Sequence, residues 1–192
     1  MELKKFDFLK SKYGYCSSWA IWQNVGDTPK SNIGDLSVLE PTKQLLNTLK
    51  PKIVLLGLNF SDRDVNIPLA NFHDKSSKAT DFKLRYALKN TRYWGAYMTD
   101  LIKNFKEKDS SKLMSYISNN KDFLKENINI FKEELKDLEV KNKLIITLGR
   151  DVHKLVIEEF NNSNILNVPH YASYIKKEIY REFFKNYEKS DA

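Results

Sequence analysis

The sequence is poor in cysteine and has no long apolar run. Cys16 is the single cysteine among 192 residues, which excludes an intramolecular disulfide, a four-cysteine zinc site and an all-cysteine iron–sulfur cluster. No apolar stretch approaches the roughly 18 residues of a membrane-spanning helix, and the first residues, Met1-Glu2-Leu3-Lys4-Lys5, lack the apolar segment of a signal peptide. We therefore expect a cytoplasmic monomer that binds no membrane, no metal and no other cofactor.

Three common signatures of phosphate-binding and hydrolytic enzymes are also missing. The sequence contains no Gly-x-x-x-x-Gly-Lys-Ser/Thr loop, no Gly-x-Gly-x-x-Gly after a strand and no Gly-x-Ser-x-Gly elbow. Nucleoside triphosphatases, dinucleotide-binding enzymes and α/β-hydrolases therefore lose their usual sequence support.

The charge balance is basic and favours an anionic partner. There are 32 Lys and Arg residues against 25 Asp and Glu, a net charge of +7, and nucleic acids bind such surfaces through neutralised phosphates and released counterions. A lysine-rich composition alone explains the same charge. The lysines from 103 to 112 are interrupted by acidic residues, so a solvated face explains them, whereas Lys176 and Lys177 are better placed to meet phosphate.

The pattern of apolar residues indicates an α/β fold in a single domain over residues 1–192. With 41% hydrophobic residues the chain can bury a substantial core. After a first helix the stretch up to residue 40 reads as irregular, with one short strand possible at 19–22, and regular alternation follows. Strands are predicted at 52–58, 93–102, 143–149 and 164–168, and helices at 2–12, 40–50, 82–89, 121–138, 150–160 and 175–187. This alternation predicts a three-layer α/β/α sandwich with a mainly parallel central sheet of about four strands.

Two of these strands end abruptly in residues that can hold a polar ligand. Asn59 follows the strand at 52–58, and His170 follows the strand at 164–168. Because the carboxyl ends of parallel strands converge on one crevice, two segments about 110 residues apart can build one site.

Four segments, in this order, resemble the uracil-DNA glycosylase superfamily. They are Gly57-Leu58-Asn59-Phe60-Ser61, Gly95 to Leu101, Leu144 to Gly149, and Pro169-His170-Tyr171-Ala172-Ser173, and the resemblance spans roughly residues 50 to 175. The first resembles the branches whose motif runs Gly-hydrophobic-Asn-Pro-Gly, with Phe60 in place of the proline. The last resembles a His-Pro-Ser turn, with Tyr171-Ala172 in place of the proline. The resemblance implies a DNA repair enzyme that flips a damaged base, uracil being expected, and hydrolyses its N-glycosidic bond.

The chemistry of that reaction gives roles to the two strand ends. Cleavage of an N-glycosidic bond needs a positioned water and a hydrogen-bond donor to the departing base. Asn59 can orient the water, and His170 can donate to the base. Asn cannot ionise, so a carboxylate would be a stronger base, and Asp62 or Asp64 lies close enough in sequence to supply one.

Base and phosphate contacts complete the predicted site. A flipped base needs a flat wall, for which Phe60, Phe72 and Tyr93 are candidates, beside Gly57 and Leu58 of the first motif. Phosphate contacts fall to four residues near the two strand ends: Ser61, Ser173, Lys176 and Lys177.

Each of these residues also has a purely structural interpretation. Asn59 can cap a turn, the His170 segment can be an ordinary surface turn, and Phe72 and Tyr93 can be core residues. Asp100 can be a strand-end residue that bonds the backbone. Three functional hypotheses remain: a DNA glycosylase, a binding module of the same fold with weak or lost catalysis, and an α/β enzyme acting on a free nucleoside or another small anion.

Overall fold

The computed structural model describes residues 1–23, 26, 28, 34–60, 67–76, 78–160 and 164–190. Its centre is a five-stranded, mostly parallel sheet with the order β1-β3-β2-β4-β5. The strands are β1 (Ser17–Trp19), β2 (Lys50–Asn59), β3 (Ala96–Ile102), β4 (Leu144–Leu148) and β5 (Ile165–Val168). Strands β2 to β5 pair in parallel, and β1 pairs antiparallel with β3. The α/β class is confirmed, while the predicted strand number of four was too low because β1 adds an edge strand.

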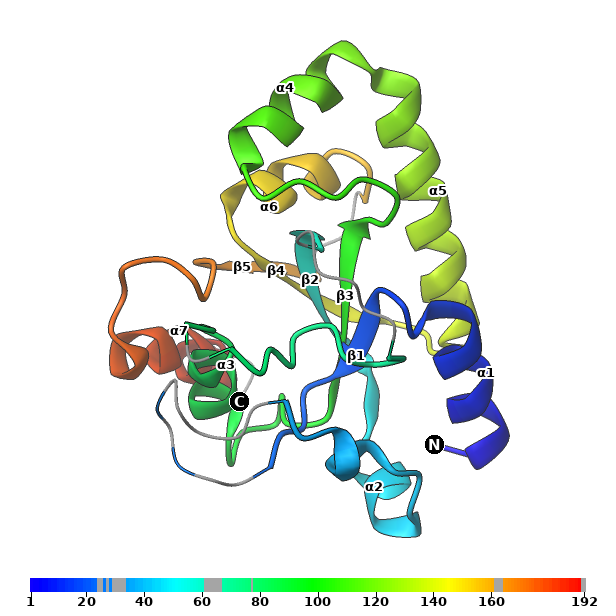
Figure 1. The fold of residues 1–192 in the computed structure, drawn as a ribbon, viewed down its shortest axis with the longest axis vertical. Coiled ribbons are helices and arrows are strands. Elements are labelled where there is room, and N and C mark those ends of the chain that lie inside the picture. Colours follow the sequence, from blue (N-terminus) through cyan, green and yellow to red (C-terminus); the bar gives the residue numbers. More distant parts are fainter. Residues whose placement is uncertain are drawn as a thin grey trace.

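Helices surround this sheet (Figure 1). They are α1 (Leu3–Tyr13), α2 (Lys43–Thr48), α3 (Phe82–Leu88), α4 (Ser110–Asn119), α5 (Lys121–Asp137), α6 (Arg150–Ile157) and α7 (Lys177–Ser190), with a 3-10 turn η1 at Leu36–Leu39. Figure 1 shows α1 and α5 on one side of the sheet and α3 with α7 on the other.

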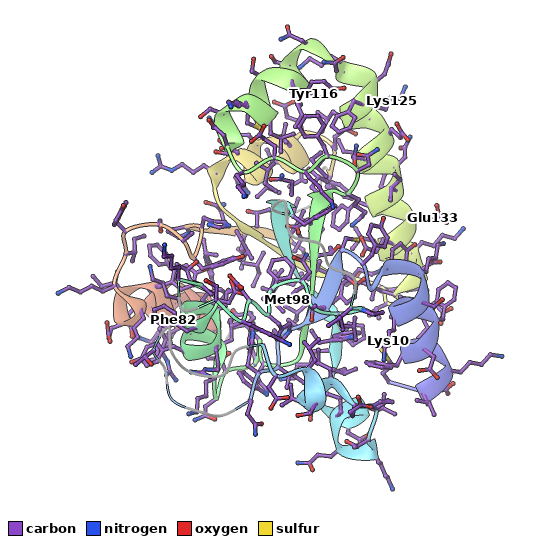
Figure 2. All side chains as sticks on the ribbon, in the orientation of Figure 1. Lys10, Phe82, Met98, Tyr116, Lys125 and Glu133 are labelled. Carbon is purple, nitrogen blue, oxygen red and sulfur yellow. The ribbon has the colours of Figure 1, made fainter. Side chains whose placement is uncertain are left out.

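Alternate residues of the strands enter two separate core clusters. Val54 and Leu56 of β2 pack with side chains of α1, α5 and α6. Leu55, between them, packs with side chains of α3 and α7. This alternation is the period of two that a strand imposes, and it explains why the run from 53 to 58 is apolar throughout: both faces of β2 are covered. Figure 2 shows Met98 among the central strands, with Lys125 and Glu133 on the outer side of α5.

Two buried segments differ from the sequence-based prediction. The short strand lies at 17–19 rather than 19–22, and Ser17, Ser18 and Trp19 are all buried. The apolar spacing in 82–89 predicts that Phe82 and Tyr86 face inward, with Ala87 or Leu88. Helix α3 instead turns Leu84, Arg85, Ala87 and Leu88 inward, and leaves Phe82 and Tyr86 half-buried.

Two helix starts also differ from what the sequence predicts. Pro41 is expected in the first turn of a helix, but it lies before α2, because the Thr42 side chain accepts from the Leu45 N–H as the cap. Ser110 and Ser111 are expected to cap a short helix, but Asp109 caps α4, since its side chain accepts from the Ser111 N–H.

The four parallel strands direct their carboxyl ends to one edge of the sheet. Leu56 of β2 pairs with Thr99 of β3 on one side and with Thr147 of β4 on the other. The ends of β3 and β4 therefore lie on either side of the end of β2. Leu148 in turn pairs with Val168 of β5. The residues that follow these strands are therefore neighbours in space.

Candidate functional site

A cavity of about 1050 Å³ opens at this carboxyl edge. The ends of β2, β4 and β5 line it, together with the start of α6 and the segments around Phe72 and Thr80. This is the place at which ligands bind in open α/β sheets.

The structure brings most of the predicted site residues to this cavity. Asn59 and His170 both line it, and so do Leu58, Phe60, Phe72 and Ser173. Two segments about 110 residues apart in the sequence therefore share one cavity. Ser61 lies outside the described residues, as do Asp62 and Asp64.

Other predicted residues lie away from the cavity lining. Tyr93 is fully buried and packs against Phe184 of α7, with ring centroids 5.4 Å apart, so its position is that of a core residue. Lys177 places its ammonium over the Tyr86 ring at 4.6 Å, and Lys176 is exposed and does not line the cavity. Ser173 does line the cavity, but its hydroxyl donates to the His170 carbonyl at 2.6 Å, which ties the side chain into the turn.

Asn59 is oriented by the chain that follows β3. Its Nδ2 donates to the carbonyl of Glu107 at 2.7 Å, with longer contacts to the carbonyls of Phe105 and Phe60. Carbonyl oxygens accept only, so they fix which end of the amide is nitrogen. Within the described residues the Oδ1 makes no hydrogen bond, and it is the atom that can accept from a water in the cavity.

His170 is held as a neutral ring with a defined tautomer. The N–H of Ala172 donates to His170 Nδ1 at 3.2 Å, so in the neutral ring the proton lies on Nε2. Partial desolvation and the nearby ammonium of Lys83 lower the pKa of His170. The ring stacks on Tyr171 with centroids 4.3 Å apart. His170 is therefore built to donate a hydrogen bond through Nε2 without carrying a charge.

Asp100 is a buried carboxyl group that lines the cavity. Its residue is 3% exposed, and its Oδ2 accepts from Asn71 Nδ2 at 2.8 Å. Burial raises the pKa of Asp100 to about 7, against the lowering effects of Asn71 and Lys103. Such a group gains and loses a proton near neutral pH, which suits proton transfer. Sequence reasoning left Asp100 as a structural strand-end residue and missed Asn71, whose loop has no periodic pattern.

Gly57 leaves the space that the Asp100 carboxyl group occupies, whereas Phe72 lies at an ordinary contact distance. A Cβ on Gly57 would lie 2.1 Å from Asp100 Oδ1 and 3.6 Å from Phe72 Cε1. Phe72 itself has a φ of 66°, a left-handed conformation that is rare for a bulky residue. Its carbonyl accepts from the Trp22 indole N–H at 3.2 Å. Gly57 therefore serves the site through the Asp100 side chain that it admits.

The rim of the cavity carries an aromatic side chain and several cations. Tyr174 is fully exposed, between the lining residues Ser173 and Ile175. Lys83 lies on the same side and donates to the Ser173 carbonyl at 2.8 Å. Lys108 and Arg150, both exposed, line the cavity as well. Tyr174 was missed from the sequence because exposure of a tyrosine has no sequence signal.

Comparison with known proteins found no similar protein. No protein-family model, no curated protein and no solved structure matches this chain. Among the described residues, no three His, Cys, Asp or Glu side chains gather as a metal site would require. In the same part of the chain, every helix is too short or too polar to cross a membrane.

Proposed function

We propose that this protein is a DNA glycosylase-like hydrolase, built on a three-layer α/β/α sandwich, that removes a flipped damaged base, with uracil expected. The observation that carries the proposal is the meeting of Asn59, Asp100 and His170 in one cavity beside the aromatic ring of Phe72. These groups supply what the reaction needs: a water-orienting acceptor, a proton acceptor, a donor and a stacking wall.

In the proposed reaction, water attacks the sugar carbon that bears the base. Asn59 Oδ1 orients the water, and the Asp100 carboxylate takes its proton. The new carbon–oxygen bond forms as the bond to the base nitrogen breaks, and the electron pair of that bond leaves with the base. The neutral His170 ring donates from Nε2 to a base oxygen, where the negative charge develops. A carboxylate at Asp100 removes the weakness of an asparagine acting alone.

Release of a free base is the direct test of this function. We expect purified protein to release uracil from DNA, and His170→Ala to lower the rate about 100-fold, the usual effect of losing one donor to a developing charge. The matched control is His153→Ala, because His153 contacts Thr147 and does not line the cavity. The proposal fails if no base is released from single-stranded, double-stranded or mismatched uracil DNA, or from hypoxanthine DNA.

A DNA-binding module without efficient catalysis is the second candidate. The exposed Tyr174 and the rim cations favour it, since they would bind nucleic acid whether or not the base is cut. It predicts salt-sensitive DNA binding with no base release.

Both candidates predict that Tyr174 contributes to DNA binding. Stacking on an exposed aromatic contributes about 1–3 kcal/mol per base, so Tyr174→Ala is expected to weaken binding of single-stranded DNA about 10-fold. Because the Tyr174 side chain is fully exposed, the melting temperature of the Tyr174→Ala variant should equal that of the unchanged protein. Fluorescence anisotropy at several salt concentrations measures this, with the exposed Phe8 on α1 as control through Phe8→Ala. Equal weakening by both substitutions, or none by either, would remove Tyr174 from the binding surface.

A further inference from the structure

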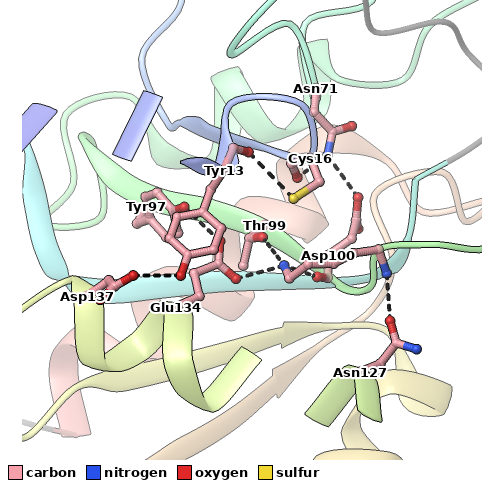
Figure 3. A network of polar contacts seen from close by, with 10 residues as sticks. Tyr13, Cys16, Asn71, Tyr97, Thr99, Asp100, Asn127, Glu134 and Asp137 are labelled. Carbon is pink, nitrogen blue, oxygen red and sulfur yellow. Dashed lines mark hydrogen bonds and ion pairs between the residues drawn. The ribbon is translucent and has the colours of Figure 1, made fainter. Parts of the chain in front are cut away.

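A buried ion pair lies directly behind the cavity, at the end of β3. Lys103 Nζ and Glu134 Oε2 are 2.7 Å apart, and their side chains are 1% and 0% exposed. Lys103 also donates to Thr99 Oγ1 at 2.8 Å and to the Asp100 carbonyl at 2.7 Å. The ammonium thus makes two hydrogen bonds and one ion pair. Figure 3 shows this network together with Asp100 and Asn71.

The network ties helix α5 to β3. The second oxygen of Glu134 accepts from the Tyr97 hydroxyl at 2.7 Å. The N–H of Lys103 donates to Asn127 Oδ1 of α5 at 3.0 Å. The two charges therefore cannot move away from the end of β3 without breaking several hydrogen bonds.

Stability alone gives no reason for charges at this position. Taking both ions out of water costs several kcal/mol each, and well-packed apolar residues of the same volume are usually as stable or more so. The pair lies between β3 and α5, with Lys103 Nζ 6.0 Å from the centroid of the Phe131 ring.

The pair acts on Asp100 more directly than on any other cavity residue. Lys103 holds the main-chain oxygen of Asp100, and its positive charge favours the carboxylate, whereas the charge of Glu134 disfavours it. Asn71 faces Asp100 from the loop after β2. Cys16 faces it from the chain before β1 and stays neutral, because burial raises the pKa of the thiol to about 12. Asp81 and His170 line the same cavity.

We propose that Lys103 and Glu134 are positioning residues that fix Asp100 in the cavity and set the pH range over which it accepts a proton. The part of this inference that concerns reaction rate rests on the proposed function. The part that concerns the titration of Asp100 does not. Burial has the largest effect on the pKa of Asp100, and the two charges act on that pKa in opposite directions, so removal of either charge alone should shift it.

A charge cycle tests this inference. Glu134→Gln removes the negative charge and keeps one acceptor oxygen for Lys103, while its amide NH2 can donate to the Tyr97 hydroxyl oxygen. Without the Glu134 charge, the positive charge of Lys103 is no longer offset and favours the Asp100 carboxylate. The titration midpoint of Asp100 should therefore move down by about one pH unit. Lys103→Met should move it up, and the double variant should return it to within about half a unit of the original, since both charges are gone. Carbon-13 NMR of the carboxyl groups measures the midpoint, with Asp100→Asn to assign the signal, and the pH dependence of base release gives the matching kinetic value.

The control is an exposed ion pair between helix α5 and the segment that follows α6. Lys132 and Glu159 are 3.3 Å apart and 45% and 47% exposed, so Lys132→Met and Glu159→Gln should leave the midpoint unchanged. If Lys103 and Glu134 had a purely structural role, their substitutions would lower the rate of base release. They would not shift the Asp100 midpoint in opposite directions that cancel in the double variant. An unchanged midpoint in folded Glu134→Gln overturns the inference, and so does a shift in the double variant as large as in either single variant. If Lys103→Met does not fold, Glu134→Gln and the double variant still test the inference. If the midpoints shift as expected but no base is released, the proposed function is wrong and the inference stands.

Discussion

Replacing Asp100 with asparagine is expected to lower base release by about 100-fold or more, the usual contribution of a general base. Asparagine keeps the shape of the side chain and can still accept from Asn71 Nδ2, so the cavity should be preserved. It cannot take a proton from water. In the unchanged protein the rate should rise with pH through about 7 and then level off, because the carboxylate is the active form and burial raises the pKa of Asp100 to about 7. Single-turnover rates from pH 5.5 to 9 measure both effects.

The same substitution is expected to stabilise the fold above neutral pH. The pKa of Asp100 is raised from its ordinary value of 3.8 to about 7 in the folded protein, so the folded state binds this proton more tightly than the unfolded state. Its contribution to stability is complete below pH 4 and is lost as the pH rises through 7. The change in the free energy of unfolding caused by Asp100→Asn should therefore be about 2–4 kcal/mol more favourable at pH 8 than at pH 4. Urea denaturation at both pH values measures this difference.

A second carboxyl gives a control of opposite sign. Burial acts to raise the pKa of Asp137, but hydrogen bonds from Lys12 and Tyr13 outweigh it and lower that pKa. Asp137→Asn should therefore cost stability above its folded pKa and little in strong acid. If both substitutions had the same pH dependence, or if Asp100→Asn gained no stability at pH 8, Asp100 would not be the buried titrating group described above.

Gly57→Ala is expected to reduce base release nearly as much as loss of Asp100. The new methyl group would lie 2.1 Å from Asp100 Oδ1, a distance that no packed pair of atoms tolerates. The end of β2 is fixed by pairing with β3 on one side and β4 on the other, so the side chain of Asp100 must move instead. Displacement of a proton acceptor by about 1 Å can cost about 100-fold in rate.

A double-mutant cycle separates this steric effect from damage to the strand. Asp100→Ala removes the oxygen with which the methyl group collides. In that background Gly57→Ala should lower the remaining rate less than twofold, whereas independent effects would multiply. Full additivity in this cycle would mean that Gly57 is needed for some other contact of the substrate or for the strand itself.

The main elements were predictable because their cause is local. The central strands β2 and β4 are covered on both faces, so their buried residues, such as Val54, Leu55 and Leu56, form an unbroken apolar run. Helix α5 repeats its buried residues, such as Ile128 and Phe131, at the spacing of one helical face. The strand β1 was uncertain because three residues carry no period, and only pairing with β3 about 80 residues away makes them a strand.

The sequence by itself determined the α/β class and the convergence of Asn59 and His170, because parallel strands end at one edge. Only the tertiary structure decided which other side chains meet at the site and which tyrosines are exposed. Asn71 meets Asp100 across 29 residues, and Glu134 meets Lys103 across 31 residues from another element. Tyr174 remains exposed while Tyr93 is buried. The physical reason is that these meetings and exposures depend on how loops and helices pack, and the free energy of packing is a property of the assembled chain rather than of any local pattern.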